Sequence, residues 1–301
     1  MITGVDSLRK EVSLWISLLE GTIEILSSLK TNKTILCVKY TEDCSCVAGG
    51  FTDGIVRLFK CADGQVFRTL FDLEIQENTS PVTSIKHRPM QMVMLKVGIT
   101  IMDNVIYTIR EKRQTYGIAY HPRLPKFITY GDDLKIYIQI PGSIDGHASR
   151  IFAACFNPRS NHEFITGGWD DVVYFWDVRQ PHAIRHLSQI HMCGEGLDIS
   201  HRGTEVLTCA WQKENPLQVY DYASGELIVT MEPDGHESLL YCGKFLNKDY
   251  AIVGGSDKST FRIIDLQTYS TVGSITGLIG GVYDLDAGPS KKSKRKIRKS
   301  P

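Results

Sequence analysis

The 301-residue sequence contains no run of 18 apolar residues, so no segment of it is expected to cross a membrane as a helix. It has eight cysteines but no Cys-x-x-Cys pair, and some of them, such as Cys155 and Cys209, lie inside apolar runs. Cysteines in such positions behave as small apolar residues, and this spacing in a chain of this size indicates reduced thiols. The sequence therefore predicts a protein of the nucleus, the cytoplasm or both.

The motifs of common enzyme classes are also absent. There is no G-x-S-x-G elbow, P-loop, H-E-x-x-H motif or Rossmann glycine set. The acidic pairs at 132–133 and 170–171 lie where turns are expected, and turn aspartates explain them without acid–base chemistry. The group most similar to a metal site consists of His182, His186, His191 and Cys193. It lacks the closely spaced ligand pairs of a closed zinc site. We therefore predict no enzyme, no cofactor and no metal.

What the sequence does contain is a repeat. Aromatic or apolar anchor residues recur at intervals of 39 to 44 residues, with one double interval of 78 that leaves room for a degenerate unit. Gly146-His147 precedes the clearest unit and Trp176-Asp177 ends it. A period near 40 to 45 with these flanks is typical of four-stranded propeller blades. The anchors are Trp15, Phe59, Tyr137, Trp176, Tyr220 and Ile264, with the seventh expected between residues 78 and 112.

The repeats resemble those of the WD40-repeat family over nearly the whole chain. The Gly-Gly pairs at 49–50, 167–168 and 254–255, each after an apolar run, add to the resemblance. It implies an all-β, seven-bladed β-propeller over residues 1–286, followed by a tail of residues 287–301. We expect two blades to be degenerate or shortened: the unit at 81–110 and the blade that ends near residue 145.

The two ends of the propeller are expected to share one composite blade. Residues 281–286 resemble a first strand with nothing after it, whereas residues 1–4, 12–16 and 22–29 resemble the second, third and fourth strands. Pairing them would remove two exposed strand edges, which an isolated propeller requires.

The resemblance also implies a buried hydrogen-bonded tetrad in the clearest blade. His147, Thr166, Asp170 and Trp176 occupy the matching places. The implied chain runs from indole N–H through hydroxyl and imidazole to carboxylate, and it would rigidify the blade. A catalytic His147–Asp170 dyad is the alternative, which we disfavour because the pair recurs in step with the repeat.

In the WD40 family, the turns between second and third strands and the loops before first strands share one face, which is usually the docking face. Four aromatic residues fall at or beside these turns by register: Phe51, Tyr130, Trp169 and Trp211. Aromatics are common among the residues that dominate interface energies. The alternative is that each ring folds over its own turn. The set as a whole favours docking.

These features predict a non-enzymatic scaffold that brings proteins together. The alternative is a substrate receptor of a cullin-type ubiquitin ligase, because Trp176-Asp177-Val178-Arg179 is similar to the W-D-x-R box of such receptors, in which the arginine contacts the ligase adaptor. A propeller hydrolase is disfavoured, because no nucleophile or metal set is present.

The zero net charge of the chain conceals a basic tail. Seven cations at its end leave 27 basic against 34 acidic residues, so the propeller carries about −7 and is a poor nucleic-acid binder. The tail resembles a nuclear-import signal that an importin would bind, although it could equally be a solubilising end. The cations are Lys291, Lys292, Lys294, Arg295, Lys296, Arg298 and Lys299.

Overall fold

The computed structural model describes residues 2–5, 11–19, 22–71, 80–86, 113–124, 126–138, 143–231, 239–256, 260–278 and 280–288. Within these ranges the regular elements are all β-strands, arranged in six antiparallel four-stranded sheets. No helix in these ranges has the length and apolar character needed to traverse a lipid bilayer.

Five of the sheets are blades made of four strands that are consecutive in the chain. The first two blades comprise β4 (Ile35–Tyr40), β5 (Cys46–Phe51), β6 (Val56–Lys60) and β7 (Val66–Leu70), and then β8 (Thr115–Tyr120), β9 (Phe127–Gly131), β10 (Lys135–Ile138) and β11 (Ser143–Asp145). The third comprises β12 (Ile151–Phe156), β13 (Glu163–Gly168), β14 (Val172–Asp177) and β15 (Arg185–Ser188). The last two comprise β16 (Leu197–Ile199), β17 (Glu205–Cys209), β18 (Leu217–Asp221) and β19 (Leu227–Thr230), and then β20 (Leu240–Phe245), β21 (Tyr250–Gly255), β22 (Phe261–Asp265) and β23 (Ser270–Ile275).

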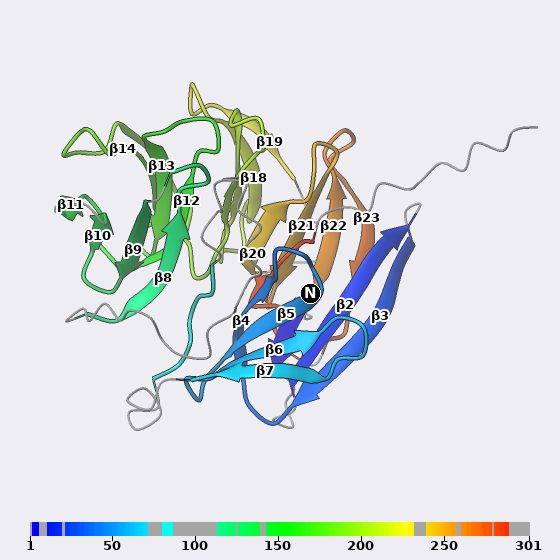
Figure 1. Cartoon of the computed structure of the whole chain (residues 1–301). Helices are drawn as coiled ribbons and strands as arrows, with labels where there is room; N and C mark the ends of the chain where they lie inside the picture. Colours follow the sequence, from blue (N-terminus) through cyan, green and yellow to red (C-terminus); the bar gives the residue numbers. More distant parts are fainter. Residues whose placement is uncertain are drawn as a thin grey trace, which may run out of the picture.

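The sheets follow one another around an axis, as the order of colours in Figure 1 shows. The first strand of each blade lies innermost and contacts the first strand of the next, in the order β8, β12, β16 and β20. Adjacent blades pack face to face, so that the core consists of layers between sheets. In one such layer, Phe175 of β14 packs edge-on against Tyr222, which follows β18 in the next blade, with ring centroids 5.3 Å apart. A second strand is therefore covered on both faces, which explains why β13 and β21 are almost continuously buried instead of alternating.

The sixth sheet joins the two ends of the described chain. β24 (Asp284–Leu285) pairs with β1 (Ile2–Val5), which continues to β2 (Glu11–Leu19) and β3 (Thr22–Thr31). The register places Ile2 opposite Leu285. The predicted pairing of the chain ends is thus confirmed, and β3 lies beside β23 of the neighbouring blade (Figure 1).

The predicted number of seven blades is wrong. The described residues form five blades and the composite sheet, and each of the six anchor residues named above lies on the third strand of one of these sheets. The seventh was counted from the double interval between Phe59 and Tyr137. Of the expected unit at 81–110, the structure describes only residues 81–86, which form no strand.

Residues 80–86 instead run as an extended segment between the first two blades. The Val82 N–H donates to the Phe51 carbonyl (3.0 Å), and the Thr83 hydroxyl donates to the Thr115 carbonyl (3.3 Å). In the blade that ends near residue 145, the outer strand β11 is present but has only three residues.

Candidate functional site: the aromatic face and the central channel

The structure brings the four tetrad residues together. The indole N–H of Trp176 donates to the Thr166 hydroxyl (2.7 Å), which lies 2.7 Å from His147 Nε2. His147 Nδ1 lies 2.9 Å from Asp170, whose carboxylate also accepts the Ala148 N–H. Burial by itself would raise the pKa of Asp170, but the hydrogen bond and charge of His147 lower it. The polar groups of these four side chains are all hydrogen-bonded within the blade, so the arrangement stabilises the blade.

A continuous arc of aromatic rings lies on one face of the propeller. Successive ring centroids are 5.0 to 6.4 Å apart, which is the range for favourable aromatic pairs. The arc spans four blades and the composite sheet, on the face where the first strands begin and the second strands end. We call it the aromatic arc, and its members are Tyr116, Phe152, Trp169, His191, Trp211, Tyr241 and Tyr283.

Three arc members owe their position to β-bulges in the innermost strands. The pairing of β12 with β13 shifts between Ile151 and Ala153, so Phe152 is the extra residue. Tyr116 of β8 and Tyr241 of β20 occupy the same place in their strands. A bulge re-aims the side chain of its extra residue. All three rings consequently line a cavity at the end of the central channel.

Two of the predicted docking aromatics belong to the arc. Trp169 is 41% exposed, stacks on His191 and lies under the Arg150 guanidinium at 5.4 Å. The neighbouring His191 Nδ1 lies 2.6 Å from the Asp171 carboxylate. Trp211 is half-buried and continues the arc on the other side of His191.

The docking prediction for Phe51 and Tyr130 is wrong, because both rings are 1% exposed and belong to the core. Phe51 pairs with Ile35 at the place where, in the clearest blade, Gly168 pairs with Ile151. The Gly-Gly pair at 49–50 therefore lies one residue earlier in its strand, and a shift of one residue turns a side chain to the other face.

Sequence reasoning missed the bulge aromatics and Tyr283. Three of these four residues have a signal that could have found them: the aromatic residue directly follows a buried apolar residue at the start of an innermost strand or just before it. These pairs are Ile151-Phe152, Leu240-Tyr241 and Val282-Tyr283.

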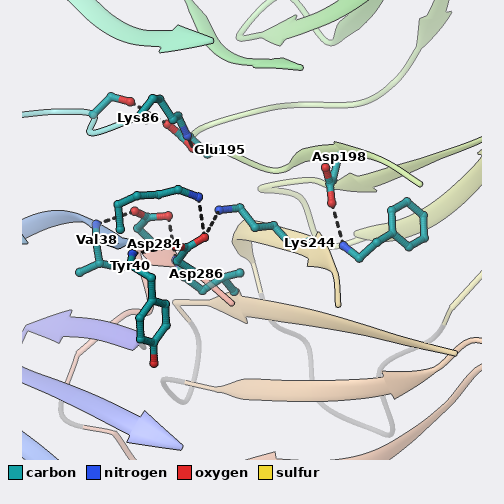
Figure 2. A network of polar contacts seen from close by, with 12 residues as sticks. Val38, Tyr40, Lys86, Glu195, Asp198, Lys244, Asp284 and Asp286 are labelled. Carbon is teal, nitrogen blue, oxygen red and sulfur yellow. Dashed lines mark hydrogen bonds and ion pairs between the residues drawn. The ribbon is translucent and has the colours of Figure 1, made fainter. Parts of the chain in front are cut away.

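Charged side chains from five segments meet in the central channel, as Figure 2 shows. Lys86 pairs with Glu195, which also accepts the Ser84 hydroxyl (3.1 Å). Asp286 pairs with Lys39 (2.7 Å) and Lys244 (3.2 Å).

Backbone groups also hold the carboxylates of this network. Asp286 accepts the Tyr40 N–H (2.9 Å), and Asp284 accepts the Val38 N–H (2.7 Å). Asp198 accepts the Phe245 N–H (2.8 Å) (Figure 2). Asp284 of β24 and Asp286 directly after it thereby tie the composite sheet to β4 of the first blade.

The pKa values of Asp284, in β24, and of Asp286, directly after β24, shift in opposite directions. Burial, reinforced by the nearby Glu195 carboxylate, raises the pKa of Asp284 to about 6. For Asp286 burial also acts upward, but the ammonium groups of Lys244 and Lys39 outweigh it and hold its pKa well below the usual range.

The raised pKa of Asp284 predicts a pH-dependent stability. Between its unfolded value near 3.8 and about 6, the folded state binds more protons, so this residue stabilises the fold at low pH and loses that contribution as pH rises through 6. The groups acting on it are Glu195, Lys244 and Lys86. Between pH 4.5 and 7.5, Asp284 should lower the free energy of unfolding of the wild type by about 1–2 kcal/mol. We expect the Asp284→Asn variant to lack this decrease.

Urea unfolding of the wild type and the variant at several pH values measures this difference. Glu226→Gln, at an exposed carboxylate, is the matched control. Parallel stability profiles for wild type and Asp284→Asn would contradict the assignment.

The channel is hollow at both ends, and the two cavities differ in charge. The cavity beside the aromatic arc has a volume of about 330 Å³, and Glu195 and Asp284 are the charged residues among those that line it. The other cavity measures about 1160 Å³, and Lys39, Lys86 and Lys244 line it together with acidic residues. Among the described residues, the charged groups that line the cavity beside the arc are thus carboxylates, and the three lysines line the other cavity. Glu195 lines both cavities and is paired with Lys86.

Arg179 lies at the other end of β14 from Trp169. Its side chain is 65% exposed, and its Nε donates to the buried Asp177 carboxylate at 2.9 Å. The adaptor contact that the W-D-x-R resemblance implies stays a prediction. The basic tail at 291–299 lies outside the described residues, and its role in nuclear import also stays a prediction. Among the described residues no three potential ligands are grouped so as to hold a metal ion.

Comparison with known protein families gives a match. The family described as WD40, WD domain, G-beta repeat matches residues 139–177, which contain His147, Thr166, Asp170 and Trp176 of the tetrad. Curated proteins offer no match to the chain. The matched repeat and the propeller arrangement of four-stranded sheets together support the WD40-repeat β-propeller family for this chain.

Proposed function

We propose that this chain is a non-enzymatic scaffold that binds other proteins on the face that carries the aromatic arc. WD40 propellers generally mediate protein–protein interactions and are generally not enzymes. The observation that carries the proposal is the continuity of the arc: seven rings from successive sheets lie on one face, at the mouth of the channel. Large aromatic side chains on a rigid surface favour binding, because they bury much area and lose little conformational entropy.

A variant of the two arc tryptophans tests the proposal. We expect Trp169→Ala with Trp211→Ala to weaken the capture of partner proteins at least tenfold, since aromatic hot spots each contribute about 2 kcal/mol or more. Affinity capture with quantitative mass spectrometry, on wild type and variant at equal concentration, measures the loss.

The matched control removes two exposed aromatics away from the arc. Phe67 lies on the outer strand β7, and Tyr269 lies in the turn between β22 and β23. Phe67→Ala with Tyr269→Ala should retain the partners. A folded Trp169/Trp211 variant that captures the same proteins as the wild type would exclude the arc as the docking surface.

No feature of Arg179 beyond the box itself favours the ubiquitin-ligase alternative, because its guanidinium is already engaged by Asp177.

A further inference from the structure

The 330 Å³ cavity is lined by aromatic rings and by carboxylates. Its walls include the rings of Tyr116, Phe152, Tyr241 and Tyr283, and its charged lining groups are the carboxylates of Glu195 and Asp284. The bulges described above place three of these rings, so the shape follows from strand pairing and is already formed without a ligand.

We propose that this cavity binds one lysine or arginine side chain of a partner protein, whose flanking residues lie across the aromatic arc. This inference rests on the proposed scaffold function and specifies the chemistry of the partner. Aromatic faces attract ammonium and guanidinium groups, and a carboxylate at the end of such a pocket completes the charge pairing.

The carboxylates retain the capacity to accept such a group. Glu195 accepts one bond on each oxygen, from Ser84 and Lys86, and Asp284 likewise accepts the N–H groups of Val38 and Leu285. An ionised carboxylate offers about four acceptor sites, so each retains room for a further donor. Lys86 already pairs with Glu195, but the residues that line this cavity include no cation to receive an anionic ligand. An apolar side chain would strip water from the carboxylates without replacing its hydrogen bonds.

The size of the cavity and its surroundings favour a side chain over a free small molecule. A volume of 330 Å³ lies at the lower end of the range for small-ligand sites, about 300–1000 Å³. Trp169, His191 and Trp211 continue the arc beyond the residues that line the cavity, and they provide a surface for the residues on either side of the inserted cation.

Short peptides serve as probes of the intact chain. We compare acetylated and amidated Gly-Gly-X-Gly-Gly peptides in which X is arginine, lysine or norleucine, using isothermal titration calorimetry. We expect the arginine and lysine peptides to bind at least tenfold more tightly than the norleucine peptide. Equal affinity of all three would overturn the inference, and so would n-butylguanidinium binding as tightly as the arginine peptide.

Variants of the cavity locate the binding. Glu195→Gln and Tyr283→Leu should each lower the affinity for the arginine peptide at least fivefold and leave the affinity for the norleucine peptide unchanged. Tyr283→Leu does not touch the Lys86–Glu195 pair, so it keeps the test valid if Glu195→Gln fails to fold. Glu205→Gln, at a carboxylate that lines the larger cavity, is the matched control and should not change binding.

Failure of this inference differs from failure of the scaffold proposal. If the tryptophan variant loses its partners but the cavity variants bind all peptides as the wild type does, the scaffold stands and the cation site is excluded. If the peptides discriminate as expected but the tryptophan variant keeps its partners, the cation site stands, and the arc is excluded both as the docking surface and as the place of the flanking residues.

Discussion

Asp286→Ala should lower the free energy of unfolding by about 3 kcal/mol, because removing one partner of a buried ion pair leaves the other charge uncompensated. The carboxylate is 6% exposed and pairs with both Lys39 and Lys244. It also accepts the Tyr40 N–H, so the substitution removes the acceptor of a backbone donor in β4 as well. Urea unfolding at pH 7, followed by far-ultraviolet circular dichroism, measures the change.

Two further variants separate charge from hydrogen bonding at Asp286. Asp286→Asn keeps an acceptor for the Tyr40 N–H and removes only the charge, so we expect a smaller loss than for alanine. Glu226→Ala, at an exposed site, should change stability by less than about 0.5 kcal/mol. A loss below about 1 kcal/mol for Asp286→Ala would mean that the network does not hold β24 to the first blade.

Thr166→Val should cost about 2–4 kcal/mol, although valine nearly matches threonine in shape. The hydroxyl accepts from Trp176 and bonds to His147 Nε2, so its loss strands two buried polar groups, each worth about 1–3 kcal/mol. The same unfolding experiment measures this variant.

The next blade supplies a matched control for Thr166. Thr208 occupies the fourth position of β17 as Thr166 does in β13, and it is equally buried. Within the described part of the chain, its hydroxyl has a single hydrogen bond, to the Gln218 carbonyl (3.3 Å), so Thr208→Val should cost about 1 kcal/mol. Similar losses in the two variants would show that the tetrad adds nothing beyond an ordinary buried threonine.

The spacing of the anchors predicted the β-propeller well, because a third strand is buried between neighbouring sheets and needs an apolar or aromatic residue there. Trp176 and Ile264 are fully buried in this way. An interval contains no information about pairing, however. The 78 residues between Phe59 and Tyr137 are compatible with a further sheet or with a long connection, and only coordinates distinguish the two.

The candidate site was harder to predict, because it depends on register between strands. Trp169 and Phe51 both follow a Gly-Gly pair, yet Trp169 is exposed and Phe51 is buried. The reason is that the Gly-Gly pair before Phe51 lies one residue earlier in its strand than the pair before Trp169. The bulges that aim Phe152 and Tyr241 arise from cross-strand pairing, which no local pattern specifies. The channel network likewise joins Lys39 to Asp286, residues at opposite ends of the described chain.

The position of β14 between two rims of the propeller bears on how many proteins can bind at once. The strand separates the rim with Trp169 from the rim with Arg179, and its six residues span about 20 Å at the usual rise of 3.3 Å per residue. A ligand that contacts only one rim therefore leaves the other rim accessible. Such a geometry suits a ternary complex in which neither bound protein displaces the other.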